Sequence, residues 1–126
     1  MPTHLDHFAT HHQAFVDHVD GRPVVVCRGD LDLAAVDDMW RCIESARHSS
    51  RPLVVDLSEA TFMDSAAVAL LLRAYRLQGR LRESVVLRHP SPAAMRVLSM
   101  TQLPDLVDIE HDPVGEARSA IQAVYA

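Results

Sequence analysis

Apolar residues along the chain form short β-prone runs that alternate with helical stripes. Two of the runs, 14–19 and 23–31, flank the pair Asp20-Gly21. Both residues of this pair tolerate positive φ angles, so the pattern predicts a tight turn and an N-terminal hairpin. The continuous apolar run 24–27 predicts a strand that is covered on both faces.

Four later segments carry apolar residues three or four positions apart, which predicts amphipathic helices. The second of these segments starts at Asp64 or Ser65, and Gly79 is well placed to end it. The stripes comprise Val36, Met39, Trp40 and Ile43; Val68, Leu71, Leu72 and Tyr75, widened by Leu70 and Leu77; Met95, Leu98 and Met100; and Val114, Ala117, Ile121 and Val124.

Proline and cap residues mark the boundaries of the last two predicted helices. Ser91-Pro92 and Asp112-Pro113 each place an N-cap residue before a proline at the first helical position. Leu103-Pro104 is interpreted as the end of the helix that Pro92 begins.

Three further apolar runs, at 53–57, 84–88 and 106–110, predict strands between these helices. The expected order is ββαβαβαβα, an α/β fold with about four helices packed on a mixed β-sheet. Residues 1–12 are polar and rich in histidine, which predicts a flexible tail before a single domain over 13–126.

Charge and length narrow the function classes. The chain has 126 residues, a net charge of −5 and twelve basic residues, all of them arginine and scattered, so nucleic-acid binding has little support. Without lysine, a phosphate-binding loop and Schiff-base chemistry are excluded. The longest apolar stretch, 66–72, is too short to span a bilayer, and no secretory signal is visible. We therefore expect a cytoplasmic protein without membrane insertion.

Side chains that could carry chemistry are few. Cys27 and Cys42 are interpreted as buried free thiols, with a redox pair as the alternative. A metal site at the N-terminal histidines lacks a cysteine or acidic cluster to complete it, and His89 and His111 read as surface positions. No Ser-His-acid motif or glycine-rich loop is present. We therefore expect no enzymatic activity, no metal and no cofactor. The N-terminal histidines are His4, His7, His11 and His12.

Three motifs occur in a fixed order. Gly29-Asp-Leu-Asp32 closes the second predicted strand, a valine-rich strand ends in Asp56-Leu-Ser58 before Thr61-Phe-Met-Asp-Ser65, and Ser91-Pro-Ala-Ala-Met-Arg-Val-Leu98 follows. This set resembles the STAS family, whose bacterial members are anti-sigma-factor antagonists. The resemblance extends from about Phe15 to the C-terminus and identifies the predicted domain with a STAS domain.

The resemblance implies a function for the second predicted helix. In the family, the serine after the aspartate is phosphorylated by an anti-sigma factor that has serine kinase activity and holds ATP. Ser65, preceded by Asp64, matches that serine, and Asp30 and Asp32 match acids of the partner surface. The second serine and the glycine of the motif are Ala66 and Ala67 here.

The residues themselves permit two readings of this segment. Asp64 or Ser65 can be a plain N-cap, and Asp30 and Asp32 can belong to a solvated loop. If the two segments share one end of the sheet, a phosphate on Ser65 would add about −1.5 to −2 charge beside these carboxylates. The helix dipole tolerates that charge, so the fold should survive while an acidic partner is repelled. Small residues 66–68 would let a partner approach closely.

Two other functions stay open at this level. The departures at Ala66 and Ala67 leave room for a non-phosphorylated scaffold, or a small subunit of a stress-signalling or membrane lipid-transport complex. A phospho-aspartate receiver would use acids such as Asp30, Asp32 and Asp56, but the absent lysine and the initial hairpin argue against it. The expected oligomeric state is a monomer or weak dimer.

Overall fold

The computed structural model describes residues 11–112, so the helix predicted after Asp112 lies outside the described residues. Within this range the chain forms a mixed α/β fold that begins with a hairpin, as the sequence predicts. The elements are β1 (His12–Val19), β2 (Arg22–Leu31), η1 (Leu33–Ala35), α2 (Val36–Ala46), β3 (Leu53–Asp56), β4 (Ala60–Met63), α3 (Ser65–Leu77), η2 (Arg82–Ser84), β5 (Val85–Arg88), α4 (Pro92–Leu98), α5 (Leu103–Leu106) and β6 (Asp108–Glu110).

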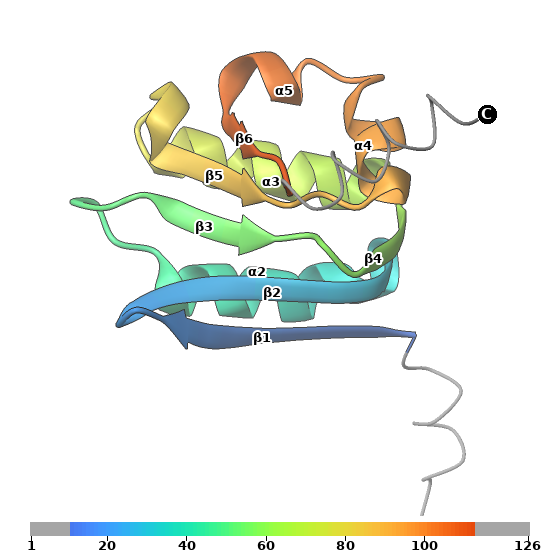
Figure 1. Cartoon of the computed structure of the whole chain (residues 1–126), viewed down its shortest axis with the longest axis horizontal. Helices are drawn as coiled ribbons and strands as arrows, with labels where there is room; N and C mark the ends of the chain where they lie inside the picture. The colour runs from blue at the N-terminus through green and yellow to red at the C-terminus, as the bar shows by residue number, and fades with distance from the viewer. Residues whose placement is uncertain (1–10, 113–126) are drawn as a thin grey trace, which may run out of the picture.

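The strands form one sheet in the order β1-β2-β3-β5-β6 (Figure 1). β1 is antiparallel to β2, and the turn between them has positive φ angles at Asp20 and Gly21, which confirms the predicted hairpin. The other pairings are parallel, as strand–helix–strand connections require. α2 and α3 lie next to each other behind the sheet in Figure 1.

β2 pairs with two different strands along its length. Residues 24–26 pair with β3, and residues 29–31 pair with β4. The changeover occurs at Gly29, whose backbone N–H donates to the Glu59 carbonyl oxygen at 3.0 Å. As a result, β2 and β4 run in parallel to the same edge of the sheet, where the predicted site residues lie.

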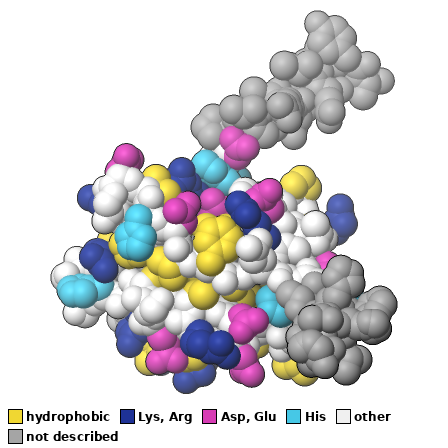
Figure 2. All heavy atoms as spheres, turned by 90° about the horizontal axis from the view of Figure 1, so that it is seen from below, with side chains coloured by type: hydrophobic (Ala, Val, Ile, Leu, Met, Phe, Trp, Pro, Cys, Tyr) yellow, Lys and Arg dark blue, Asp and Glu magenta, His cyan; other side chains and the backbone are white. Residues whose placement is uncertain are grey.

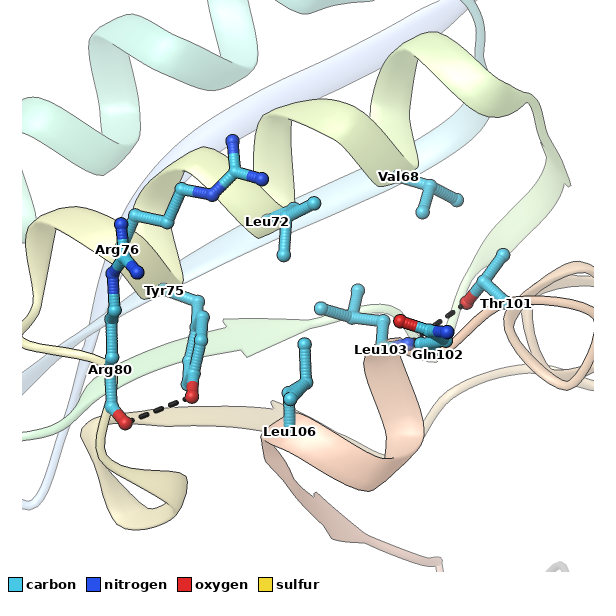
Figure 3. Close-up of a pocket in the computed structure, with 9 residues that line it drawn as sticks. All are labelled: Val68, Leu72, Tyr75, Arg76, Arg80, Thr101, Gln102, Leu103 and Leu106. Carbon is cyan, nitrogen blue, oxygen red and sulfur yellow. Dashed lines mark hydrogen bonds between the residues drawn. The ribbon is translucent and has the colours of Figure 1, made fainter.

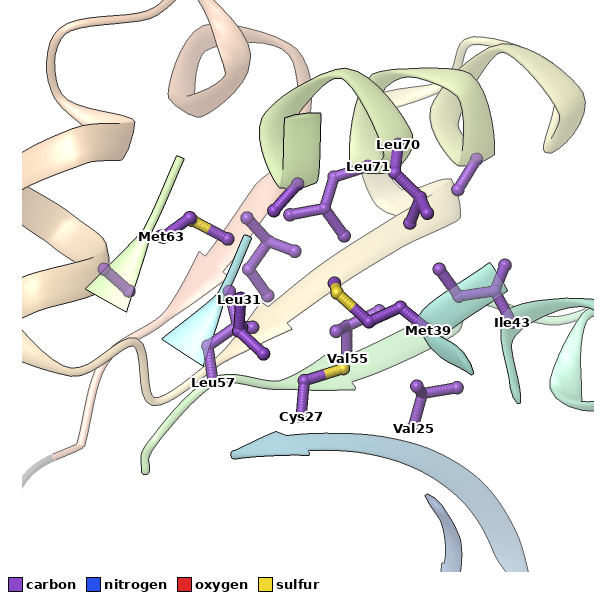
Figure 4. Close-up of a cluster of buried hydrophobic side chains, with 14 of the residues drawn as sticks. Val25, Cys27, Leu31, Met39, Ile43, Val55, Leu57, Met63, Leu70 and Leu71 are labelled. Atoms are coloured by element: carbon purple, nitrogen blue, oxygen red, sulfur yellow. The ribbon is translucent and has the colours of Figure 1, made fainter. Parts of the chain in front are cut away.

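The hydrophobic core lies between the sheet and helices α2 and α3 (Figure 4). Val25, Cys27 and Val55 point from the sheet toward Met39 of α2 and Leu71 of α3, and all five are fully buried. Val24 and Val26 are also buried on the opposite side of β2, as the continuous apolar run predicts. The apolar faces of α2 and α3 therefore pack on the sheet, whereas their polar faces and the start of α3 lie at the surface.

Several boundaries differ from the sequence prediction. β4 was not expected, and Leu103 begins the short helix α5 instead of ending α4. Met100 and Leu77 were assigned to buried stripes, yet they are 75% and 48% exposed, because α4 and α3 end at or before them. The last strand starts at Asp108 and not at Leu106, which α5 occupies.

No helix among residues 11–112 is long and apolar enough to cross a membrane. Both cysteines are free thiols, as predicted; Cys27 is buried, whereas Cys42, also predicted to be buried, is half-buried. Burial raises the pKa of Cys27 to about 12, and burial also raises the pKa of Cys42. A thiol with a raised pKa is a poor nucleophile at neutral pH, which fits structural roles.

Candidate functional site

The two motifs that contain the predicted site residues meet at the edge where β2 and β4 end. Leu31 pairs with Met63, and the Asp64 backbone N–H donates to the Leu31 carbonyl oxygen at 3.1 Å. Asp30 and Asp32 therefore lie beside the start of α3. The predicted site depends on this proximity, and the strand register provides it.

Asp64, and not Ser65, caps helix α3. Its carboxylate accepts hydrogen bonds from the backbone N–H groups of Ala66 at 2.9 Å and Ala67 at 3.3 Å. Ser65 is the first residue of the helix and is exposed. Within residues 11–112 its hydroxyl has no hydrogen-bond partner, so it is free to meet another molecule.

Each of the two acids on the neighbouring loop also has a structural role. The Asp30 carboxylate accepts a hydrogen bond from the Thr61 hydroxyl at 2.9 Å and so joins β2 to β4. Asp32 caps η1 by accepting from the Ala34 N–H at 3.0 Å. Both residues are half-buried. Their hydrogen bonds hold one carboxylate oxygen of each, and both carboxylates still contribute negative charge to this edge of the sheet.

The three small residues after Ser65 point in three directions. Ala66 lines a groove between α2 and α3, whereas Val68 lines a pocket on the other side of α3. Ala67 is fully buried in the core, so its side chain cannot contact a partner, and the prediction is wrong for this residue.

A groove that was not predicted from the sequence lies beside Ser65. It has a volume of about 350 Å³ and runs between α2 and α3. Leu33, directly after the Gly29-Asp-Leu-Asp32 motif, lines it and is 74% exposed. Trp40 and Arg73 also line it, and the Arg73 guanidinium carbon lies 4.1 Å from the centre of the Trp40 ring. The sequence feature that could have indicated this groove is Leu33, a large apolar residue directly after the acidic motif.

A second pocket, of about 470 Å³, lies between α3 and α5 (Figure 3). Leu72, Leu103 and Leu106 point into it, and the Tyr75 hydroxyl at one end donates to the Arg80 carbonyl oxygen at 2.9 Å. Because α5 was not predicted, this pocket had no counterpart in the sequence analysis. It lies on the side of α3 that faces away from α2.

The third motif holds α4 against the site. Ser91 caps α4 by accepting from the Ala94 N–H at 3.1 Å, and its hydroxyl donates to the Ala60 carbonyl oxygen of β4 at 2.6 Å. Asp56, at the end of β3, accepts hydrogen bonds from the backbone and hydroxyl of Ser58. These contacts give both residues local structural roles.

Metal and nucleic-acid sites gain no support from the described part of the chain. Among residues 11–112, no group of three or more metal-ligating side chains comes together. His12 instead bonds Asp38 at 2.8 Å, and His4 and His7 lie outside the described residues. On the face shown in Figure 2, arginine and acidic side chains are interspersed and do not gather by sign.

Solved structures that are similar to this fold include two anti-sigma factor antagonists. An anti-sigma factor antagonist from Mycobacterium paratuberculosis has a TM-score of 0.69 and 24% sequence identity, over 88% of this chain and 94% of that one. The anti-sigma factor antagonist SpoIIAA in its unphosphorylated form has a TM-score of 0.57 and 22% identity, over 88% of this chain and 97% of that one.

None of the curated proteins matches this chain in sequence. A family model described as "Mlab, STAS domain" matches residues 14–108. This range includes the hairpin, the acidic loop, the start of α3 and the Ser91-Pro92 cap, so every motif on which the resemblance depends lies inside it. The chain therefore belongs to the STAS family.

Proposed function

We propose that the protein is an anti-sigma-factor antagonist that binds an anti-sigma factor with serine kinase activity, releases a sigma factor, and is switched off by phosphorylation of Ser65. The observation that carries the proposal is the exposed hydroxyl of Ser65, which has no hydrogen-bond partner among residues 11–112, at the edge of the sheet that also holds Asp30, Asp32 and Asp64. The solved structures with this fold include anti-sigma factor antagonists, which supports the same role.

The chain supplies an acceptor hydroxyl, and the partner supplies ATP and the catalytic groups. In the transfer, the Ser65 oxygen forms a bond to the γ-phosphorus while the bond from that phosphorus to the bridging oxygen of ADP breaks. The hydroxyl proton goes to a base of the kinase. The antagonist itself is non-catalytic in this scheme.

Asp64 determines where the added charge acts. Its carboxylate already occupies the N–H groups of Ala66 and Ala67, so a phosphate on Ser65 finds these helix-end donors taken. Repulsion from Asp64 directs the dianion outward to the solvent. We therefore expect the modification to change the binding surface and to leave the fold intact.

The test measures binding of a cognate anti-sigma factor to unphosphorylated protein and to Ser65→Ala and Ser65→Asp variants. We expect Ser65→Ala to bind like wild type and Ser65→Asp to lose affinity by about tenfold or more, with unchanged circular dichroism. Ser49→Asp is the matched control, because Ser49 is exposed in the turn between α2 and β3 at the opposite edge. Incubation with ATP should add one phosphate to wild type and none to Ser65→Ala; equal binding by all variants contradicts the switch.

A second function, a STAS scaffold or transporter subunit without phosphorylation, is favoured by one observation. Ala66 and Ala67 replace the serine and glycine of the family motif. Ala67 is fully buried, so this replacement fits the packing of α3 and leaves the Ser65 hydroxyl exposed. Stable co-purification with a membrane transport complex, without incorporation of phosphate, would select this function over the first.

A further inference from the structure

The groove between α2 and α3 has an apolar lining that reaches the phosphorylation site. Ala66 and Ala69 stand three residues apart on α3 and leave the space open, because small side chains do not fill it. Leu33 lies at the same edge of the sheet as Ser65 and is largely exposed. The apolar lining residues are Leu33, Val36, Trp40, Ala66, Ala69 and Leu70.

Two opposite charges mark the groove. Asp37, in the first turn of α2, is exposed, and within the described chain its carboxylate has no hydrogen bond or ion pair. Arg73 stands eight residues after Ser65, which places it about 12 Å along the axis of α3 at 1.5 Å per residue. Its guanidinium stacks on Trp40 and pairs with no acid among residues 11–112. The groove thus has a negative group near the Ser65 end and a positive group further along.

We infer that this groove receives a helix of the protein partner, with an apolar side chain in the groove, a basic residue at Asp37 and an acidic residue at Arg73. An amphipathic helix in a groove is a recurrent mode of protein recognition. Asp37 precedes Trp40 by three residues, just under one helical turn, and the Arg73 guanidinium stacks on Trp40, so the basic and acidic residues of the partner helix stand three or four positions apart. The inference rests on the proposed function in taking the partner to be the protein whose binding Ser65 controls.

This assignment gives the switch a physical cause that does not depend on the net charge of the partner. Ser65 directly precedes Ala66, which lines the groove, so a phosphate on Ser65 lies at the mouth of the groove. A docked helix would remove water from that dianion next to apolar side chains. Desolvation of an unpaired charge opposes docking strongly.

Trp40 is the only tryptophan of the chain and lines the groove, so its fluorescence reports occupation directly. In titrations with the cognate anti-sigma factor, Ala69→Phe should fill the groove and lower affinity by about tenfold or more. Ala69 is exposed, so the substitution leaves the core intact. Arg76→Phe is the matched control, since Arg76 is on the same helix but lines the pocket on its other side.

The two variants separate the inference from the proposed function. Loss of binding in Ala69→Phe together with normal binding in Ser65→Asp supports the groove and contradicts the switch. Loss in Ser65→Asp together with normal binding in Ala69→Phe, whose fold is verified by circular dichroism, overturns the groove and leaves the switch standing.

A synthetic helix tests the groove without the kinase. The probe is a stapled peptide with leucines beside a lysine and a glutamate four positions apart, and the control peptide has the two charges exchanged. We expect the first peptide to shift Trp40 emission in wild type and not in Ala69→Phe. The double variant Asp37→Arg/Arg73→Glu should prefer the exchanged peptide. A Trp40 emission that neither peptide shifts, or no change of preference in the double variant, overturns the inference.

Discussion

Gly29 occupies a position in the acidic motif where no side chain has room. Its φ angle is +81°, and an added Cβ would collide with the backbone carbonyl oxygen of His11. Gly21, with φ of +77°, has no atom within 4 Å of such a Cβ. Both glycines therefore need a positive φ angle, but only Gly29 also lacks space for a Cβ atom.

This difference predicts unequal effects of the same substitution. Gly21→Ala should lower the free energy of unfolding by about 1 kcal/mol, the cost of positive φ alone. Gly29→Ala should lower it by about 2 kcal/mol or more, because the β1 backbone must also move. Urea denaturation of both variants measures the difference. Equal losses of unfolding free energy would contradict the prediction, because they would show that the β1 backbone moves without an energetic penalty.

Asp64 gives a second prediction at the level of one side chain. Removing its cap by Asp64→Ala should destabilise the protein by about 1 kcal/mol, whereas Asp64→Ser, which keeps a capping oxygen, should recover most of that loss. Asp37→Ala is the control, because Asp37 lies in a first turn but is not a cap. Thermal and urea unfolding of the three variants provide the measurement, and a loss in Asp64→Ala no larger than in Asp37→Ala contradicts the capping role.

The sequence identified these residue types but could not divide their roles. Asp64 and Ser65 are both good caps, and only the backbone conformation at Asp64 assigns the cap to it and frees Ser65. Ala66, Ala67 and Val68 are adjacent in sequence, yet the 100° step of the helix sends them to a groove, the core and a pocket. Burial of Ala67 depends on how α3 is rotated against the sheet, which a single helical stripe does not specify.

At the scale of elements, a hydrogen bond between side chains joins the first strand to the first long helix. His12 of β1 bonds Asp38 of α2 through Nε2 and Oδ2 at 2.8 Å, and the His12 side chain is 8% exposed. The hydrogen bond from His12 lowers the pKa of Asp38, with a further contribution from its charge. This contact fixes α2 over the edge strand of the sheet.

The lowered pKa predicts a pH dependence with a definite sign. An acid whose pKa is lower in the folded state contributes stability that is fully present above its ordinary value of 3.8 and is lost as pH falls through the folded value. Asp38→Asn should therefore be less stable than wild type at pH 6, and the two should converge as pH falls through the lowered pKa of Asp38. Urea denaturation from pH 6 downward tests it, and an Asp38→Asn variant as stable as wild type at pH 6 would contradict the prediction.

Helices with strong apolar periodicity and good caps were predictable, and short elements were not. α3 and α4 begin where Asp64 and Ser91 predict. β4 has two exposed residues, Thr61 and Phe62, between two buried ones, so its pattern does not alternate, and its pairing with the end of β2 depends on the tertiary fold. α5 is a single turn around Pro104, below the length at which periodicity is informative.

At the scale of the whole molecule, Cys27 reports on global stability. It lies on β2 between β1 and β3, is fully buried, and packs in the core with residues of α2 and α3. Burial raises its pKa to about 12, so both access and ionisation protect it in the native state. Its exposure requires the sheet and helices to separate, which couples thiol labelling to unfolding of the domain.

Thiol labelling therefore provides a prediction for the entire domain. In a Cys42→Ser variant, where Cys27 is the only thiol, modification by iodoacetamide at pH 8 should be slow in native buffer and should accelerate with urea in parallel with loss of circular dichroism. The reciprocal Cys27→Ser variant should label faster in native buffer, because Cys42 is only half-buried and local motion suffices to expose it. Rapid native labelling of Cys27 would mean that the sheet opens locally around β2. The acidic loop and the start of α3 would then lack the rigid support that a phosphorylation switch confined to the surface requires.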